Sequence, residues 1–228
     1  MSRNTRLEHN TPADIERTSF AIIGEELEAR GIALPPETEP VVKRVIHTTA
    51  DFDYAANLRF TENAVERGGL ALRSGCTIVT DTNMARAGIS KPALQKLGGD
   101  LVCYMADPAV AARAKEEGTT RATVSMAVAA EEHPDAVFAI GNAPTALFAL
   151  DRLIRETDFF PALVIGVPVG FVNVVEGKET LFATCEARGI PAIFSMGRKG
   201  GSNVAAAICN ALLYRAAHMP DPKDRGWN

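Results

Sequence analysis

One segment of the sequence, VVKRVIHTTAD at residues 41–51, places two fixed cations beside a histidine. The apolar residues at 41, 42, 45 and 46 recur at the spacing of one helix face, which predicts a short amphipathic helix. Lys43, Arg44 and His47 then share the opposite face. Because imidazole titrates near neutral pH, this face could hold an acidic ligand and exchange a proton with it. The alternative is a solvated helix face, and the spacing by itself favours an ordinary surface histidine at position 47.

The charge of His47 should depend on what lies next to it. The dipole near a helix C-terminus favours imidazolium, whereas the adjacent Lys43 and Arg44 disfavour it. A bound polycarboxylate would neutralise the two cations and shift His47 toward its protonated form. We therefore hypothesise a site that acquires its acid only when the ligand arrives.

A second candidate, MGRKGGS at residues 196–202, follows a predicted strand and begins the last predicted helix. Glycines such as Gly200 and Gly201 let the backbone approach a ligand, and a helix start favours an anion. Arg198 adds a planar fork that suits a carboxylate or a phosphate. The segment matches neither the Walker A loop nor the GxGxxG fingerprint. It is either an anion site or a flexible turn with solvated cations.

Two further turns precede predicted helices. In GNAPTAL, Asn142 could cap the helix or donate to a ligand carbonyl, and capping explains it without a ligand. In GVPVGFVNVVEG, Asn173 and Glu176 have the spacing of a capping box. Phe171 in that segment is more typical of a core position than of an exposed contact.

The elements that must position these residues alternate along the chain. Continuous apolar runs predict strands, and helical periodicity predicts helices between them. We expect a single three-layer α/β domain over residues 1–228, with a mostly parallel five-stranded doubly wound sheet and two N-terminal helices. The strands are expected at 76–80, 101–105, 136–140, 162–167 and 190–195, and the helices near 12–30, 38–49, 107–117, 120–132, 143–156, 174–188 and 201–217.

Ligands of doubly wound sheets bind beyond the carboxyl ends of the strands. That rule selects the loops at 80–84, 141–145, 166–171 and 196–202, which we call the carboxyl edge. The order of the strands cannot be derived from the sequence.

Composition excludes several classes of function. The 228 residues are 46% hydrophobic, and the net charge of −4 with a pI near 5.6 argues against a nucleic-acid partner. We expect residues 1–10 to form a flexible tail. The polar N-terminal segment has no signal-peptide core, and no apolar run is long enough to cross a bilayer. Four separated cysteines and four unpaired histidines predict no metal site. We expect a cytoplasmic protein without a membrane partner.

Five segments together resemble the precorrin-8X methylmutase family of cobalamin biosynthesis. They are SFAII (19–23), RVIH (44–47), AIGNAPTAL (139–147), PVGFV (168–172) and GRKGGS (197–202), in the family's order and across nearly the whole chain. The resemblance implies an isomerase that moves a methyl group from carbon 11 to carbon 12 of precorrin-8X or cobalt-precorrin-8, giving hydrogenobyrinate or cobyrinate. It implies no cofactor, and a homodimer with tetrapyrrole sites near the subunit interface.

The resemblance also implies roles for individual residues. The family's proton donor and acceptor falls on His47, and its substrate-contacting serine and arginine fall on Ser19 and Arg44. Its ligand-facing loop falls on Arg198, Gly200, Gly201 and Ser202, and we add Asn142 to the expected substrate contacts. The segment TTADFDY after His47 leaves Thr48, Asp51 and Tyr54 without an assigned role.

The residues suit this chemistry. A suprafacial 1,5-shift on a conjugated macrocycle needs no nucleophile, and it is helped by a well-placed proton and by clamped carboxylate arms. Two rivals remain at this point: a non-catalytic corrinoid carrier on the same fold, and a phosphate- or nucleotide-binding α/β enzyme that uses GRKGGS. The sequence does not say whether the substrate carries cobalt.

Overall fold

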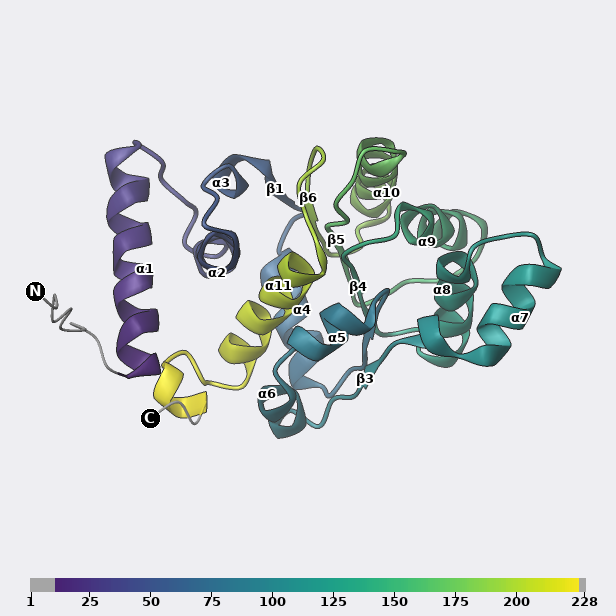
Figure 1. The fold of residues 1–228 in the computed structure, drawn as a ribbon, viewed down its shortest axis with the longest axis horizontal. Coiled ribbons are helices and arrows are strands. Elements are labelled where there is room, and N and C mark those ends of the chain that lie inside the picture. Colours follow the sequence, from purple (N-terminus) through teal and green to yellow (C-terminus); the bar gives the residue numbers. More distant parts are fainter. Residues whose placement is uncertain (1–10, 226–228) are drawn as a thin grey trace, which may run out of the picture.

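The computed structural model describes residues 11–225, so the expected tail at 1–10 lies outside the described residues (Figure 1). Helices and strands alternate along most of the chain. In order they are α1 (Pro12–Ala29), α2 (Glu39–Thr49), α3 (Tyr54–Asn57), β1 (Leu58–Phe60), α4 (Ala64–Arg73), β2 (Ile78–Thr80), α5 (Asn83–Gly88), α6 (Lys91–Lys96), β3 (Leu101–Val102), the 3₁₀ helix η1 (Tyr104–Ala106), α7 (Pro108–Glu116), α8 (Arg121–Glu132), β4 (Val137–Ile140), α9 (Pro144–Glu156), β5 (Leu163–Gly166), α10 (Val174–Arg188), β6 (Ala192–Ser195), α11 (Ser202–Ala216) and the 3₁₀ helix η2 (Pro222–Arg225).

The sheet has six strands in the order β1-β6-β5-β4-β2-β3, and all its pairs are parallel except β1 with β6. The expected count of five strands is therefore wrong. The five expected strands are present in shorter form, and the sixth is β1, which pairs antiparallel at the edge with Leu58 opposite Ser195. A mixed sheet with one antiparallel edge strand is common in folds of this kind.

The parallel strands define a switch point between β2 and β4. From β2 the chain moves outward to β3, and then returns to place β4, β5 and β6 successively on the other side. Two neighbouring strands whose connections leave in opposite directions open a crevice at their carboxyl ends. The loops after β2 and β4 meet there.

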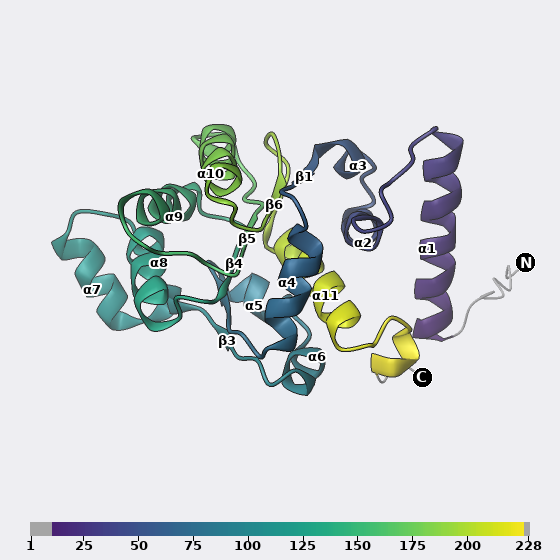
Figure 2. The same ribbon diagram turned by 180° about the vertical axis from the view of Figure 1, so that it is seen from behind.

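Helices cover both faces of the sheet, because successive side chains of a strand point to opposite sides. On β4, Val137 and Ala139 pack into one buried cluster with residues of α2, α4, α5, α6 and α11. Phe138 and Ile140 pack into the other with residues of α8, α9 and α10. Figures 1 and 2 show α1 at one end of the molecule, beside α2 and close to the C-terminal η2.

The seven expected helices are present within one or two residues of their expected ends, whereas the short helices α3 to α6 were not expected. Two capping expectations are wrong. Asn173 takes the left-handed conformation (φ 59°), and within the described residues its side chain makes no capping bond to α10. Ala143, not Asn142, is the N-cap residue of α9.

Candidate functional site

The polar face of α2 forms as its periodicity predicts, and the structure shows that it turns toward α1. Val41, Val42, Val45 and Ile46 are almost fully buried, which leaves Lys43, Arg44 and His47 on the other side of the helix. The imidazole of His47 stacks on the ring of Phe20 from α1, with 5.1 Å between ring centroids and 26° between the planes.

Ser19 precedes Phe20 on the same helix, and its Oγ donates to the carbonyl oxygen of Ile15. Arg44 and His47 thus both contact α1 at Phe20, whereas the hydrogen bond of Ser19 stays within α1.

Arg44 is held by a buried carboxylate that the sequence did not reveal. Its Nη2 donates to Oε1 of Glu16 at 2.8 Å, and Nη2 of Arg225 in η2 donates to the same oxygen at 2.6 Å. The guanidinium of Arg44 also lies over the ring of Phe20, 4.5 Å from its centroid, and 5.4 Å from that of Tyr214. Glu16 and Arg225 are 209 positions apart, so no local pattern could have paired them.

The same neighbours set the protonation of His47. Burial lowers the pKa of His47 below its ordinary value of 6.5, and the positive charge of Arg44 lowers it further. The negative charge of Glu16 opposes this effect, and Arg225 adds the smallest contribution, which again lowers the pKa. For Glu16 itself, burial raises the pKa, but the hydrogen bonds from Arg44 and Arg225 outweigh burial and leave the pKa below the ordinary value. Near neutral pH the imidazole is accordingly neutral.

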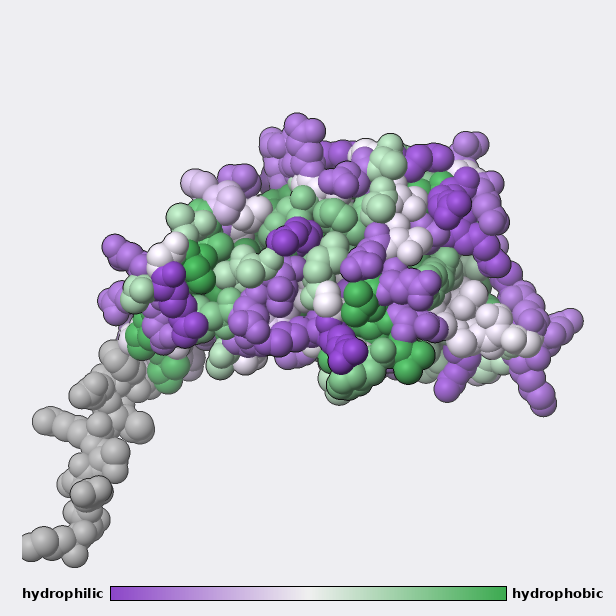
Figure 3. Space-filling model, turned by 90° about the horizontal axis from the view of Figure 1, so that it is seen from above, coloured by the Kyte–Doolittle hydropathy of each residue, from purple (hydrophilic) through white to green (hydrophobic). Residues whose placement is uncertain are grey.

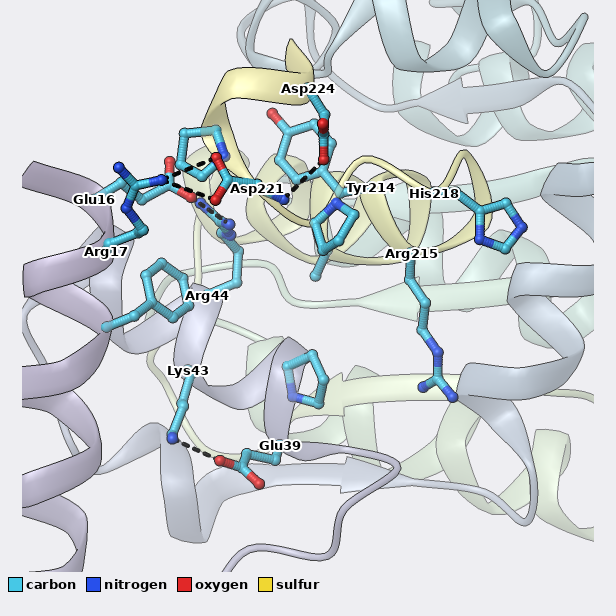
Figure 4. A pocket seen from close by; sticks show the side chains of 15 residues that line it. Glu16, Arg17, Glu39, Lys43, Arg44, Tyr214, Arg215, His218, Asp221 and Asp224 are labelled. Atoms are coloured by element: carbon cyan, nitrogen blue, oxygen red, sulfur yellow. Dashed lines mark hydrogen bonds and ion pairs between the residues drawn. The ribbon is translucent and has the colours of Figure 1, made fainter. Parts of the chain in front are cut away.

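A cleft of about 1070 Å³ opens between α1, α2, α11 and η2, beside this junction (Figure 4). Several of its charges are already paired, with 2.5 Å between Lys43 and Glu39 and 2.9 Å between Arg17 and Asp221. Arg44 and Phe20 line the cleft and His47 does not. The lining residues are Glu16, Arg17, Phe20, Glu39, Pro40, Lys43, Arg44, Ala211, Tyr214, Arg215, His218, Pro220, Asp221, Pro222 and Asp224.

The turn after β4 is organised by Asp81, another residue that the sequence did not single out. This fully buried carboxylate accepts the backbone N–H groups of Gly141, Asn142 and Ala143 at 2.7–2.8 Å. The start of α9 therefore already holds a carboxylate of the protein. Asn142 has its backbone committed to Asp81 and its side chain exposed.

The GRKGGS loop packs closely on the loop after β5. A Cβ at Gly200 would lie 2.1 Å from the carbonyl oxygen of Val167, and Gly201 donates its N–H to that same carbonyl. Ser202 is buried, and its Oγ lies 2.7 Å from Oγ1 of Thr82 in the loop after β2. These three residues hold strand-end loops together, a packing role that spacing alone does not distinguish from ligand contact.

Arg198 differs from its neighbours because its side chain is exposed. It lies over the ring of Phe171, 5.3 Å from the centroid. Phe171 is 81% exposed and the adjacent Val172 is 75% exposed, so the expectation of a core phenylalanine is wrong. Figure 3 views the molecule from above Figure 1 and shows hydrophobic and hydrophilic side chains intermixed on that face.

Lys199 joins the two groups of candidate residues. Its Nζ lies 2.6 Å from Oδ2 of Asp51 and 2.6 Å from Oδ2 of Asp53, in the segment that follows α2. Of the residues that the sequence left open, Asp51 thus pairs with Lys199, and Tyr54 is buried. The structure places the end of the His47 helix against the loop that carries Arg198.

Residues 11–225 contain neither a membrane-spanning helix nor a cluster of metal ligands. None of these helices is long and apolar enough to cross a membrane. In the same part of the chain, no three histidine, cysteine, aspartate or glutamate side chains are grouped so that they could hold a metal ion.

Comparison with known proteins agrees with the resemblance. The family model described as precorrin-8X methylmutase matches residues 14–215. The cobalt-precorrin-8 methylmutase of Salmonella typhimurium is 46% identical over 207 residues, 89% of this chain and 95% of that protein. The protein of the same name from Priestia megaterium is 44% identical, over 88% of this chain and 87% of that one.

A solved structure agrees as well. The precorrin-8X methylmutase from Thermus thermophilus superposes with a TM-score of 0.80 at 41% sequence identity, over 90% of this chain and 98% of that one. The chain belongs to the precorrin-8X methylmutase family, whose members are isomerases that move a methyl group.

Proposed function

We propose that this protein moves the methyl group from carbon 11 to carbon 12 of precorrin-8X or cobalt-precorrin-8, and that His47 gives and takes the proton that assists the shift. The observation that carries the proposal is the setting of His47, which is stacked on Phe20 and adjoins the cationic Arg44. Membership of the family supplies the reaction class.

The electrostatics of His47 support a proton that arrives with the substrate. In the free protein burial and Arg44 keep the pKa of the imidazole low. A substrate with several carboxylates brings negative charge toward Arg44 and offsets this effect, which favours imidazolium in the complex. Protonation of the macrocycle would then stabilise the electron-poor π-system that the shift produces.

We propose that two arginines hold carboxylate arms of the substrate. Arg198 is exposed, and its cation lies over Phe171. Nη2 of Arg44 donates a hydrogen bond to Glu16. Within the described residues, the other N–H groups of Arg44 have no protein acceptor. Clamping the arms fixes the macrocycle relative to His47, which converts binding energy into orientation.

The test is turnover by purified protein. Conversion of precorrin-8X is followed in the visible spectrum as the corrin chromophore forms, and binding of hydrogenobyrinate is measured separately. We expect His47→Ala to lower kcat by about 10²–10⁴-fold, the usual contribution of a general acid, and to leave product affinity within a few-fold. His133→Ala, at the far end of α8, is the matched control and should retain both activities.

Two results would count against this proposal. Full turnover by His47→Ala would remove its proton role. Tight product binding without any turnover by the wild type would support a corrinoid carrier instead. Parallel assays with metal-free and cobalt-containing substrate, compared by kcat/KM, would identify the preferred one.

We extend the proposal to a homodimer. Ile15 and Ile22 are 51% and 49% exposed, and with Ser19 they lie at the i, i+4 and i+7 positions of α1, along one face. Covering this face with a second copy would bury two isoleucines and bring the partner next to Ser19. Sedimentation should show a dimer for the wild type and a monomer for the Ile15→Glu, Ile22→Glu double variant. A wild-type monomer at micromolar concentration would refute this extension.

A further inference from the structure

Lys178 is a fully buried cation that the function described above does not use. It lies on α10, and its Nζ donates to the carbonyl oxygens of Gly197 and Lys199, at 2.8 Å each. Among residues 11–225 no carboxylate lies within ion-pair distance of it. Burial lowers the pKa of Lys178 to about 8.

Such a lysine is unfavourable for the fold by itself. Removing an ammonium group from water is costly unless it is paired with an opposite charge, and here only two neutral carbonyls compensate. The neighbouring inward positions of α10 carry apolar side chains such as Leu181 and Cys185. An apolar residue at 178 would serve packing equally well, so the reason for a lysine is to be sought in the loop that it binds.

That loop has every carbonyl from 197 to 199 fixed. Lys178 donates to the carbonyls of Gly197 and Lys199. The carbonyl of Arg198 between them accepts the N–H of Gly170 at 3.2 Å. Ser195 adds its Oγ to the carbonyl of Lys199 at 2.9 Å. Held in this way, the exposed side chain of Arg198 is left over the ring of Phe171. Figure 1 shows α10 beside the loop that follows β6.

We propose that Lys178 is a positioning residue, which holds the 197–199 turn so that Arg198 meets a carboxylate of the substrate. This rests on the proposed function, and it assigns to α10 a share in substrate affinity. Lys178 does not touch the substrate. Because His47 lies on another helix, Lys178 should influence binding and leave the chemical step unchanged.

The test is Lys178→Met, which keeps the length of the side chain and removes its donors. We expect KM and the Kd for hydrogenobyrinate to rise about tenfold, as for the loss of one charge-assisted hydrogen bond. We expect kcat to stay within about twofold of wild type. Cys185→Ala, buried on the same helix and, within the described residues, without a hydrogen bond to the loop, is the matched control for general damage to α10 and should leave KM unchanged.

The double variant Lys178→Met, Arg198→Ala tests whether Lys178 acts through Arg198. If it does, the double variant binds product no more weakly than Arg198→Ala alone, whereas independent effects would multiply. Should Lys178→Met not fold, Lys178→Gln, which retains one donor group, replaces it in the same comparison. An unchanged KM and Kd in the single variant, multiplying effects in the double variant, or a fall in kcat at constant KM would each overturn the proposal. Product Kd keeps this test separate from the proposed function, because it needs no turnover.

Discussion

Glu16 carries the negative charge that joins α1, α2 and η2, so we expect its neutralisation to destabilise the protein. In the Glu16→Gln variant the shape and one acceptor oxygen remain while the charge is lost. The side chains of Glu16, Arg44 and Arg225 are only 6%, 15% and 3% exposed, so water can do little to replace the missing carboxylate.

The size of the effect follows from this burial. Removing one partner of a buried ion pair costs about 3–5 kcal/mol. The retained amide oxygen and the stacking of Arg44 on Phe20 place our expectation at the lower end, about 3 kcal/mol. For a chain of this length each kcal/mol corresponds to about 2–4 °C, so Tm should fall by about 6–12 °C.

The assay is thermal unfolding at pH 7 and at successively lower pH. The matched control is Glu26→Gln on the same helix, because Glu26 and Arg30 form a pair whose side chains are 48% and 52% exposed. Exposed pairs contribute about 0–1 kcal/mol, so the control should shift Tm by only a few degrees. A fall of less than about 2 °C in Glu16→Gln would refute the view that the carboxylate stabilises this junction.

The pH series tests in which direction the stability difference between wild type and Glu16→Gln changes with pH. The pKa of Glu16 is lowered in the folded protein, so its contribution is present above its ordinary pKa of 4.5 and is lost as pH falls through the folded value. The difference between wild type and Glu16→Gln should therefore shrink in acid. A difference that grows below pH 4.5 would contradict the assignment.

Three further predictions concern single residues. First, the pKa of His47 lies below its ordinary value of 6.5 in the free protein, so binding of hydrogenobyrinate near pH 6.5 should take up protons. Calorimetry in buffers of different ionisation enthalpy measures this proton uptake. Equal uptake by His47→Ala would contradict the prediction. Second, Gly200→Ala would place a Cβ 2.1 Å from the carbonyl oxygen of Val167 and should abolish tight product binding. In the control, Gly69→Ala inside α4, the nearest neighbour would lie at 3.6 Å, so binding should persist. Third, Asp81→Asn turns an amide N–H₂ toward backbone donors and should lower the free energy of unfolding by about 1–3 kcal/mol in urea titrations; no change would show that the three N–H groups are solvated.

The sequence predicted the elements whose pattern is repeated over many residues. Helical periodicity marks α1, α2 and α7 to α11, and uninterrupted apolar runs mark the five parallel strands. Both patterns depend only on local residue order. β1 has three residues, LRF, directly after a short helix, and it pairs with β6 more than 130 positions away. No pattern of three residues specifies such a pairing, so the sixth strand and the strand order had to come from the structure.

The candidate site divides in the same way. Periodicity placed Arg44 and His47 on one helix face, and the family resemblance added Ser19 on another helix. The residues that hold this junction together, Glu16 and Arg225, come from opposite ends of the chain. Lys178 has no signal of its own, because a lysine in a helix is ordinarily solvated, and only the fold shows that it is buried.

The buried charges also change which loops of the carboxyl edge can receive the substrate's carboxylates. From the sequence, capping explains the turn before α9 without a ligand, whereas the turn before α11 is either an anion site or a flexible turn. Asp81 already accepts the N–H groups of residues 141–143, so these three groups are not available to a ligand. In the turn before α11, the carbonyls of residues 197–199 are bound by the protein's own donors, and Arg198 points outward. A carboxylate arriving at this edge should therefore be recognised by the guanidinium of Arg198, and its affinity should depend on the buried groups that hold the turn.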